Sequence, residues 1–361
     1  MKSIYLLFLF FSIFLNAQEK TETTALDVQY FSGNVMAHTD DLQHFLQGHP
    51  NGIYLNLYQK TYGHQEWQSA FNYPDYGGYF IYQDFKNDIL GEVYGVGALY
   101  NFYFLNRNLK FNIAQGIAYT TSPHDKVTNN KNAAFGSRLV ANTNFALNYT
   151  TKLFDKFDLK AGFLFTHFSN GRIKAPNSGV NSYVLSMGVT YNFQENLERK
   201  MDTLTKEKVT EPIRYNFVLR TGVSESSIIG SGQKPFYHPA FYLDKRISRK
   251  SAFQLGTEVF FTQSYKEYIK FMAIAYPNEE VELDTDYRRI GVFVGYELFI
   301  NRISLEAQLG YYVYQPYKSD IPVYDRLGMK YYITKNIYSG LSIKTHVFLA
   351  EAMEFLIGFR L

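Results

Sequence analysis

A histidine and a serine stand two residues apart, at His167 and Ser169, and Asn181 follows fourteen residues after the histidine. Residues two apart in an extended strand point to the same face. A histidine beside a serine hydroxyl can act as its general base, and an asparagine can hold the imidazole in the tautomer that this requires. The three residue types therefore predict a serine esterase in which Ser169 attacks an ester carbonyl.

The residues after the serine are candidates for the rest of such a site. We expect the backbone N–H of Gly171, together with the side chain of Asn170, to bind the oxyanion that develops on the carbonyl oxygen. Arg172 and Lys174 follow in the same segment and are candidates for contacts with substrate phosphates. An ordinary role as solvated loop charges explains these two cations at least as well.

Apolar and polar residues alternate through almost the whole chain after residue 20. From Tyr183 to Phe193 every second residue is apolar, and the residues between them are mostly small or polar. This period of two predicts β-strands with two different faces. We expect about sixteen strands, near residues 27–37, 52–63, 76–85, 91–104, 108–121, 137–152, 156–168, 181–194, 213–224, 235–247, 250–264, 286–299, 302–315, 322–334, 337–348 and 351–361.

The composition is typical of a transmembrane barrel. The chain of 361 residues contains 32 Tyr and 32 Phe, yet its mean hydropathy is only -0.24. In a barrel strand only alternate residues face lipid, and the others face a polar interior. We therefore predict an all-β, antiparallel transmembrane β-barrel. Two arrangements fit: one barrel of about sixteen strands, which we favour, and two eight-stranded barrels in tandem, joined by the charged residues 195–211.

The N-terminus has the pattern of a secretory signal. Lys2 precedes an apolar run over residues 4–15, which is too short to span a bilayer as a helix, and Asn16-Ala17 forms a small-residue cleavage site. The expected organisation is a signal peptide at 1–17, strands with the active site at 18–194, a charged periplasmic segment at 195–211, and strands that complete the barrel at 212–361.

Loop lengths predict the orientation in the membrane. Bacterial barrels have short periplasmic turns and longer external loops, and this places both termini in the periplasm and loop 169–180 outside. His167, Ser169 and Asn181 continue the apolar, lipid-facing sides of their strands. Polar groups in hydrocarbon are costly unless they bond one another. A hydrogen-bonded relay at the level of the outer leaflet meets that requirement.

Several classes of function are excluded or disfavoured. The formal charge of +3 gives no concentrated basic face, so we expect no nucleic-acid partner. The absence of cysteine excludes a thiolate nucleophile and a cysteine-based zinc site. His64 with Glu66 lacks a third ligand, so we expect neither a metal site nor a cofactor. The sequence favours no oligomeric state, and a homodimer is compatible with it.

Two segments contain motifs of a known kind. One contains His167-x-Ser169-Asn170 followed by Pro176-Asn177-x-Gly179-x-x-Ser182-Tyr183, and the other contains Asn72-Tyr73-Pro74-Asp75-Tyr76-Gly77 with Leu90-Gly91 and Tyr94-Gly95. They resemble the lipid A 3-O-deacylase family, which includes proteins labelled acyloxyacyl hydrolases, and the second segment looks like members from the Bacteroidetes. The resemblance covers roughly residues 52–194. It implies a lipid-facing site of the His–Ser–Glu type in an eight-stranded barrel, with roles for His167 and Ser169.

The chain departs from that family in two ways. Asn181 stands where the family has glutamate, and about half of the chain lies beyond the family's usual length. A Ser–His–Asn triad is similar to that of outer-membrane phospholipase A, a dimeric and calcium-dependent barrel. We favour lipid A (lipopolysaccharide) as substrate over phospholipid, because the loop resembles the deacylases and contains no carboxylate to hold calcium. A porin or surface barrel without enzymatic activity is the remaining alternative.

Overall fold

The computed structural model describes residues 22–36, 42–43, 48–199, 210–277, 281–318, 321–347 and 349–361. The expected signal peptide at 1–17, and residues 200–209 of the charged segment, lie outside the described residues. Among the described helices, none is both long enough and apolar enough to cross a membrane.

The N-terminal half of the chain forms a closed barrel of eight antiparallel strands. The ring closes because β8 pairs with β1, in a register that runs from Ala25 opposite Asn192 to Met36 opposite Asn181. The strands are β1 (Thr23–Met36), β2 (Asn51–Lys60), β3 (Asp75–Asp84), β4 (Glu92–Phe104), β5 (Leu109–Thr120), β6 (Leu139–Phe154), β7 (Phe157–Ser169) and β8 (Val180–Asn192).

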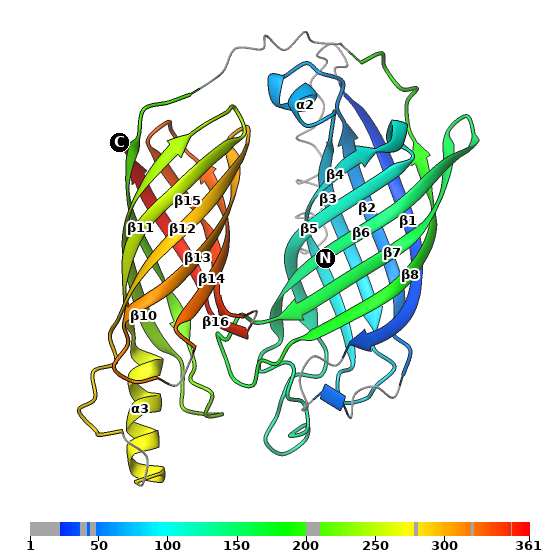
Figure 1. Cartoon of the computed structure of the whole chain (residues 1–361). Coiled ribbons are helices and arrows are strands. Elements are labelled where there is room, and N and C mark those ends of the chain that lie inside the picture. The colour runs from blue at the N-terminus through cyan, green and yellow to red at the C-terminus, as the bar shows by residue number, and fades with distance from the viewer. Residues whose placement is uncertain are drawn as a thin grey trace, which may run out of the picture.

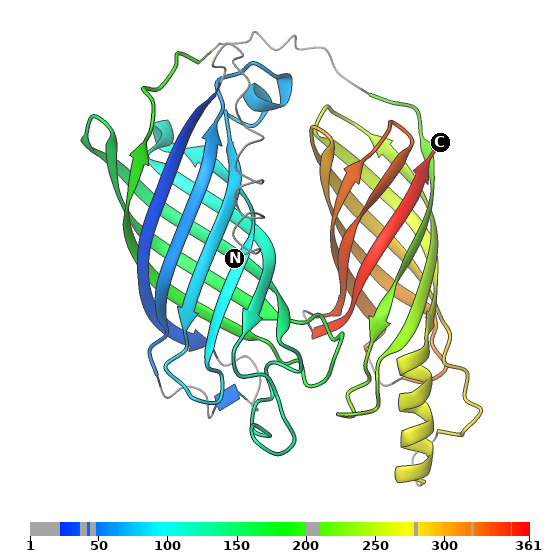
Figure 2. The ribbon, with the colours of Figure 1, turned by 180° about the vertical axis from the view of Figure 1, so that it is seen from behind.

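The C-terminal half forms a second closed barrel, in which β16 pairs with β9. Figures 1 and 2 show the two barrels as separate bodies. Its strands are β9 (Arg214–Ser224), β10 (Lys234–Arg246), β11 (Ser251–Thr262), β12 (Arg289–Ile300), β13 (Ile303–Tyr314), β14 (Val323–Tyr332), β15 (Ile337–His346) and β16 (Leu349–Arg360).

The expected sixteen antiparallel strands are confirmed, but their expected closure into one barrel is wrong. The tandem alternative is the observed one. The physical reason lies in the charged segment after β8, which has no strand alternation. Its described residues, 195–199 and 210–211, form no strand with β8 or with β9. Because β8 returns to β1, no edge is left on which β9 could continue the first sheet.

Each strand presents one side to the barrel exterior and the other to the interior. On β7, Phe163 is 66% exposed, whereas Lys160 and Leu164 are buried. The same alternation holds on β8, where Leu185 is exposed and Ser182 is buried. An apolar exterior around a partly polar interior is the pattern of an outer-membrane barrel.

The interior of the first barrel contains a small group of buried charges. Asp27 accepts a hydrogen bond from Lys110 at 2.8 Å and from Lys160, and Thr190 also donates to it. Asp27 is on β1, Lys110 is on β5, which lies opposite β1 in the ring, and Lys160 is on β7, two strands from β1. Such pairing is what makes charges tolerable away from water.

The interior of the second barrel is filled by a larger ionic network. Arg326 donates to Glu258 at 2.8 Å and to Glu354 at 2.7 Å. Lys330 lies 2.9 Å from Glu297 and 2.6 Å from Glu306. An eight-stranded barrel has an interior just wide enough for side chains to fill, and here these side chains reach one another across it. This interior is unlike that of a porin with a wide aqueous channel.

Short helical elements lie in some of the described connections. Helix α2 (Glu66–Ala70) lies between β2 and β3, and the 3-10 turn η3 (Leu105–Arg107) joins β4 to β5. Helix α3 (Gln263–Ala275) follows β11. From the strands expected near 250–264 and 286–299, residues 265–285 would be a loop between strands, and this is wrong over α3. Tyr265 and Ile269 are buried there at the four-residue spacing of one helix face.

The two barrels touch each other at both ends. Near the C-terminus and α2, at the top of Figure 1, Arg249 of the second barrel lies 2.5 Å from Glu66, and Lys250 donates to the carbonyl of Ala70. At the opposite end, Glu225 of the second barrel bonds to the loop after β7. The second barrel is therefore in contact with the segment that follows Ser169.

Candidate active site

The three side chains singled out in the sequence lie within hydrogen-bonding distance. His167 on β7 stands directly opposite Asn181 on β8 in the strand register. Its Nδ1 lies 2.6 Å from Asn181 Oδ1, and its Nε2 lies 3.0 Å from Ser169 Oγ. Because an amide oxygen can only accept, Nδ1 bears the proton in this arrangement. Nε2 is then unprotonated and can accept the serine hydroxyl proton.

The group lies on the outer side of the barrel wall. His167 and Asn181 are half-buried and continue the exterior rows of Phe163 and Leu185. Ser169 is only 4% exposed, at the end of β7. The serine is therefore buried, whereas the histidine and the asparagine are partly exposed on the exterior face.

Gly179 provides the cover over this pair. Its φ is +67°, and a Cβ added there would lie 3.1 Å from Ser169 Cβ and 3.4 Å from His167 Cε1. The backbone of the loop therefore passes directly over the two side chains. Only glycine combines this close approach with a left-handed backbone at little cost.

A row of polar side chains crosses the exterior face at the same level. Gln115 pairs with Thr143, Thr143 with His167, and His167 with Asn181, across β5, β6, β7 and β8. Thr143 and Gln115 are joined by a 2.6 Å hydrogen bond between their side chains. These two residues were not among the candidates predicted from the sequence. Each could have been noticed as a polar residue among apolar, outward-facing neighbours on its strand. On β5, for example, Gln115 stands among Phe111, Ile113 and Ile117.

The loop between β7 and β8, residues 170–179, is held together by its own polar groups. The backbone N–H of Asn170 donates to Asn177 Oδ1 at 2.7 Å, and Asn170 Nδ2 donates to the carbonyl of Lys174 at 2.7 Å. Ile173 N–H donates to the Asn170 carbonyl at 3.2 Å. Gly171 adopts a φ of +61° between these contacts. Asn170 therefore shapes the loop beside the serine.

The same loop is fixed on its other side by the connection between β5 and β6. Ser178 N–H donates to the Ala133 carbonyl at 3.1 Å, and Gly179 N–H donates to the Ala134 carbonyl at 3.2 Å. The β5–β6 and β7–β8 connections of the first barrel thus pack together. Gly179 is held over the serine by a neighbouring loop as well as by its own strand.

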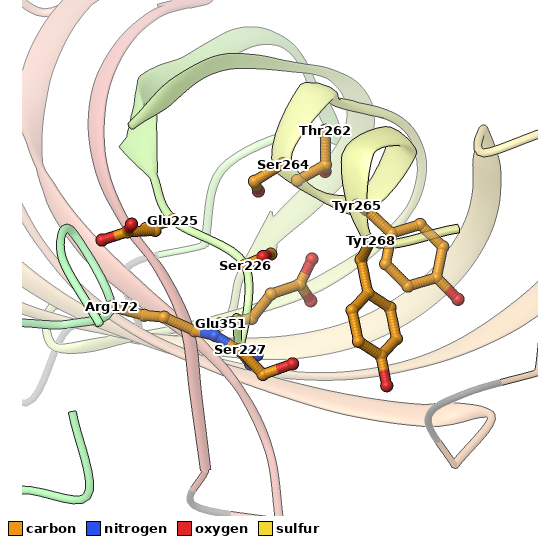
Figure 3. Close-up of a pocket in the computed structure, with 9 residues that line it drawn as sticks. All are labelled: Arg172, Glu225, Ser226, Ser227, Thr262, Ser264, Tyr265, Tyr268 and Glu351. Atoms are coloured by element: carbon orange, nitrogen blue, oxygen red, sulfur yellow. The ribbon is translucent and has the colours of Figure 1, made fainter. Parts of the chain in front are cut away.

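The two candidate phosphate ligands have different surroundings. Lys174 is exposed. Arg172 lines a cavity of about 100 Å³ to which the second barrel contributes Glu225 and Glu351. Figure 3 shows the Arg172 side chain directed toward this region of the second barrel. A phosphate contact stays a prediction for both, and Arg172 additionally faces carboxylates.

No group of three or more His, Asp or Glu side chains in the described part of the chain is arranged to hold a metal ion. His346, at the end of β15, is a buried residue of the second barrel whose Nε2 lies 2.9 Å from Tyr312 Oη. This histidine therefore belongs to the interior network.

Two protein-family models match this chain, one over each barrel. Residues 51–190 match the model of lipid A 3-O-deacylase, and residues 213–361 match that of the acyloxyacyl hydrolase C-terminal domain. Together the two matched segments cover well over half of the chain. The chain belongs to the lipid A 3-O-deacylase family. This confirms the resemblance seen in the sequence and extends it to the second barrel, which we had expected to lie beyond the family's length.

Membership supports lipid A deacylation in general, which is the hydrolysis of an ester, and an outer-membrane location. Family membership likewise implies a lipid A substrate and an outer-membrane context. The matched segments correspond to the two barrels, with β2 to β8 in the first and β9 to β16 in the second.

Solved structures of outer-membrane barrels are also similar, at low identity. Neisserial surface protein A is 13% identical, with 47% of this chain and 97% of that chain covered and a TM-score of 0.29. OccAB3 from Acinetobacter baumannii is 10% identical, with 94% and 98% covered and a TM-score of 0.22. The search of curated proteins finds no match. The barrel assignment therefore rests on the strand pairing of the chain itself.

Proposed function

We propose that this protein is an outer-membrane serine esterase that removes the 3-O-linked acyl chain of lipid A. Ser169 is the nucleophile, His167 the general base and Asn181 the residue that orients the imidazole. The observation that supports this most directly is the pair of contacts made by His167, 3.0 Å to Ser169 Oγ and 2.6 Å to Asn181 Oδ1, in a chain of a lipid A deacylase family.

The chemistry follows the serine esterase scheme. Ser169 Oγ forms a bond to the ester carbonyl carbon while its proton passes to His167 Nε2. The tetrahedral intermediate expels the sugar 3-oxygen, which takes that proton from the imidazolium. Water then attacks the acyl-enzyme with His167 again as base. The second intermediate breaks the bond to Ser169 Oγ, which takes the proton back from the imidazolium, and the fatty acid leaves.

The oxyanion requires N–H donors next to the serine. The side-chain amide of Asn170 is bonded to Lys174 and its backbone N–H to Asn177. The proposal therefore gives the main oxyanion contact to the backbone N–H of Gly171, two residues after the nucleophile. Asn170 supports this contact by fixing the turn in which Gly171 lies.

Asn181 differs from the carboxylate of the related enzymes in one electrostatic respect. It can hold the same tautomer, because its amide oxygen accepts from Nδ1. It carries no negative charge, so it stabilises the imidazolium less than a glutamate does. The triad is therefore competent for the same steps, with a smaller electrostatic contribution.

The position of the site suits a lipid substrate. The triad is on the exterior face of the wall, next to the loop end of the barrel, where β7 joins β8. If that end faces outward, as the loop lengths predict, the triad lies in the leaflet that contains lipopolysaccharide. A lipid then reaches Ser169 by lateral diffusion, without passing through the barrel.

Phospholipid hydrolysis is the second candidate, and the observation that favours it is Asn181 itself. The deciding experiment offers purified wild-type protein vesicles of lipopolysaccharide or of phospholipid, beside Ser169→Ala. Loss of an acyl chain from lipid A, with the wild type alone, supports the proposal. Serine-dependent release of fatty acid from phospholipid alone would replace the substrate and keep the triad.

A further inference from the structure

A glutamate of the second barrel holds the loop that follows the nucleophile. Glu225, directly after β9, is 3% exposed. Its Oε2 accepts the backbone N–H of Ala175 at 2.8 Å, and its Oε1 accepts that of Gly232 at 2.9 Å. Its own backbone N–H donates to the carbonyl of Arg172 at 3.1 Å. One residue thus fixes two positions in loop 170–179 and ties them to its own connection.

Two further contacts join the second barrel to the same loop. Gln233 Nε2 donates to the carbonyl of Ile173 at 3.1 Å. Gly171 lies so close to β16 that an added Cβ would be 2.9 Å from Met353 Cβ. The second barrel therefore touches this loop from Gly171 to Ala175, which is the part that follows Ser169.

This part of the loop has the backbone conformation that most needs support. Gly171 and Arg172 have φ values of +61° and +63°. A left-handed conformation is uncommon for a residue other than glycine and persists where surrounding contacts favour it. Glu225 N–H is bonded to the carbonyl of Arg172 itself. The contact from the second barrel is thus made at the unusual residue.

We propose that Glu225 is a positioning residue of the esterase, through which the second barrel holds loop 170–179 so that Ser169 and the Gly171 N–H face the same point. This inference rests on the proposed function. The first barrel is closed without the second, so barrel closure does not require residues 213–361. A carboxylate that accepts two backbone N–H groups is a strong and directional support.

The test compares Glu225→Gln with Glu66→Gln. The glutamine side chain in Glu225→Gln would set an amide NH2 against one of the two backbone N–H donors, so one hydrogen bond is lost and a repulsive contact replaces it. Glu66 also joins the barrels, through Arg249, but at the opposite end and away from the loop. It therefore controls for a general weakening of the contact between barrels.

Two readouts separate positioning from folding. The first is the rate at which a fluorophosphonate modifies Ser169, which needs no lipid. The second is kcat and KM for lipid A. We expect Glu225→Gln to lower the modification rate and kcat by about tenfold, with KM little changed. Glu66→Gln should match the wild type. Hydrogen exchange should rise within residues 170–179 of Glu225→Gln and stay unchanged in the strands.

The outcomes distinguish this inference from the proposed function. Equal modification rates for Glu225→Gln and wild type would overturn the positioning role and leave the esterase standing. If the wild type is modified at Ser169 but does not hydrolyse lipid A, lipid A is not the substrate. The modification rate of Glu225→Gln then still tests the positioning role of Glu225. If Glu225→Gln does not fold, Glu225→Asp replaces it. The shorter carboxylate cannot keep both backbone N–H contacts, so we expect a decrease of about threefold, and an unchanged rate overturns the inference.

Discussion

Nδ1 of His167 and Oδ1 of Asn181 lie 2.6 Å apart at directly paired positions of β7 and β8. The strand register therefore sets this contact, and the imidazole is oriented by a rigid hairpin pair. Ser169 is two residues along the same strand as His167. Two neighbouring strands thus hold all three side chains.

Substitution of Asn181 tests whether this residue orients the His167 imidazole. Asn181→Leu removes the acceptor that fixes the Nδ1 proton, and we expect kcat for ester hydrolysis to fall about a hundredfold. Asn181→Glu restores the carboxylate of the related enzymes and should give at least wild-type kcat. Steady-state acyl release measures both. Full activity in Asn181→Leu would contradict the orienting role.

Gly179 is expected to be intolerant of any side chain. In Gly179→Ala the new Cβ would meet the Phe168 carbonyl at 3.0 Å and Ser169 Cβ at 3.1 Å, at a φ of +67°. We expect Ser169 modification to slow by about tenfold or more. Gly230→Ala is the matched control, since it has a φ of +84° but approaches only the flexible end of Lys126. Equal effects of the two changes would show that strain alone, and not contact with the serine, matters.

Arg326 is expected to be essential for the stability of the second barrel. Arg326→Met leaves Glu258 and Glu354 without their shortest contacts to an arginine. Breaking a buried pair costs about 3 kcal/mol or more in the free energy of unfolding. Arg288→Met removes an exposed partner of Asp286 instead and should cost less than about 1 kcal/mol. Urea unfolding followed by circular dichroism measures both; similar costs would mean that the network is dispensable.

Chelation of calcium separates the two lipid substrates. Loop 170–179 contains no Asp or Glu, and both carboxylate oxygens of nearby Glu225 already accept backbone N–H groups. We therefore expect excess EDTA to leave the rate of lipid A deacylation unchanged. A loss of activity that added calcium restores would favour the phospholipase alternative.

The sequence predicted the strands and the triad because both depend on local spacing. A period of two fixes which residues share a face, so His167 and Ser169 could be placed together. It could not decide whether β8 pairs with β1 or with β9, because alternation is the same in either closure. The helix α3 was missed although Tyr265, Tyr268, Ile269 and Met272 have the spacing of one helix face, because a barrel pattern predicts strands and connecting loops alone.

The support around the serine could not be predicted from the sequence. Glu225 is fifty residues from Ala175, and only the packing of one barrel on the other brings them together. Thr143 and Gln115 could have been noticed as polar residues in apolar series. Their alignment with His167 needed the register of β5, β6 and β7.

Mass spectrometry of lipid A tests the central role of Ser169 most directly. Lipopolysaccharide is incubated with wild-type protein, with Ser169→Ala, and with Ser182→Ala, whose serine is on β8 beside Asn181 but is buried inside the barrel. We predict that the wild type and Ser182→Ala remove one 3-O-linked acyl chain and that folded Ser169→Ala removes none. Removal by Ser169→Ala, or by none of the three folded proteins, would contradict the proposed esterase.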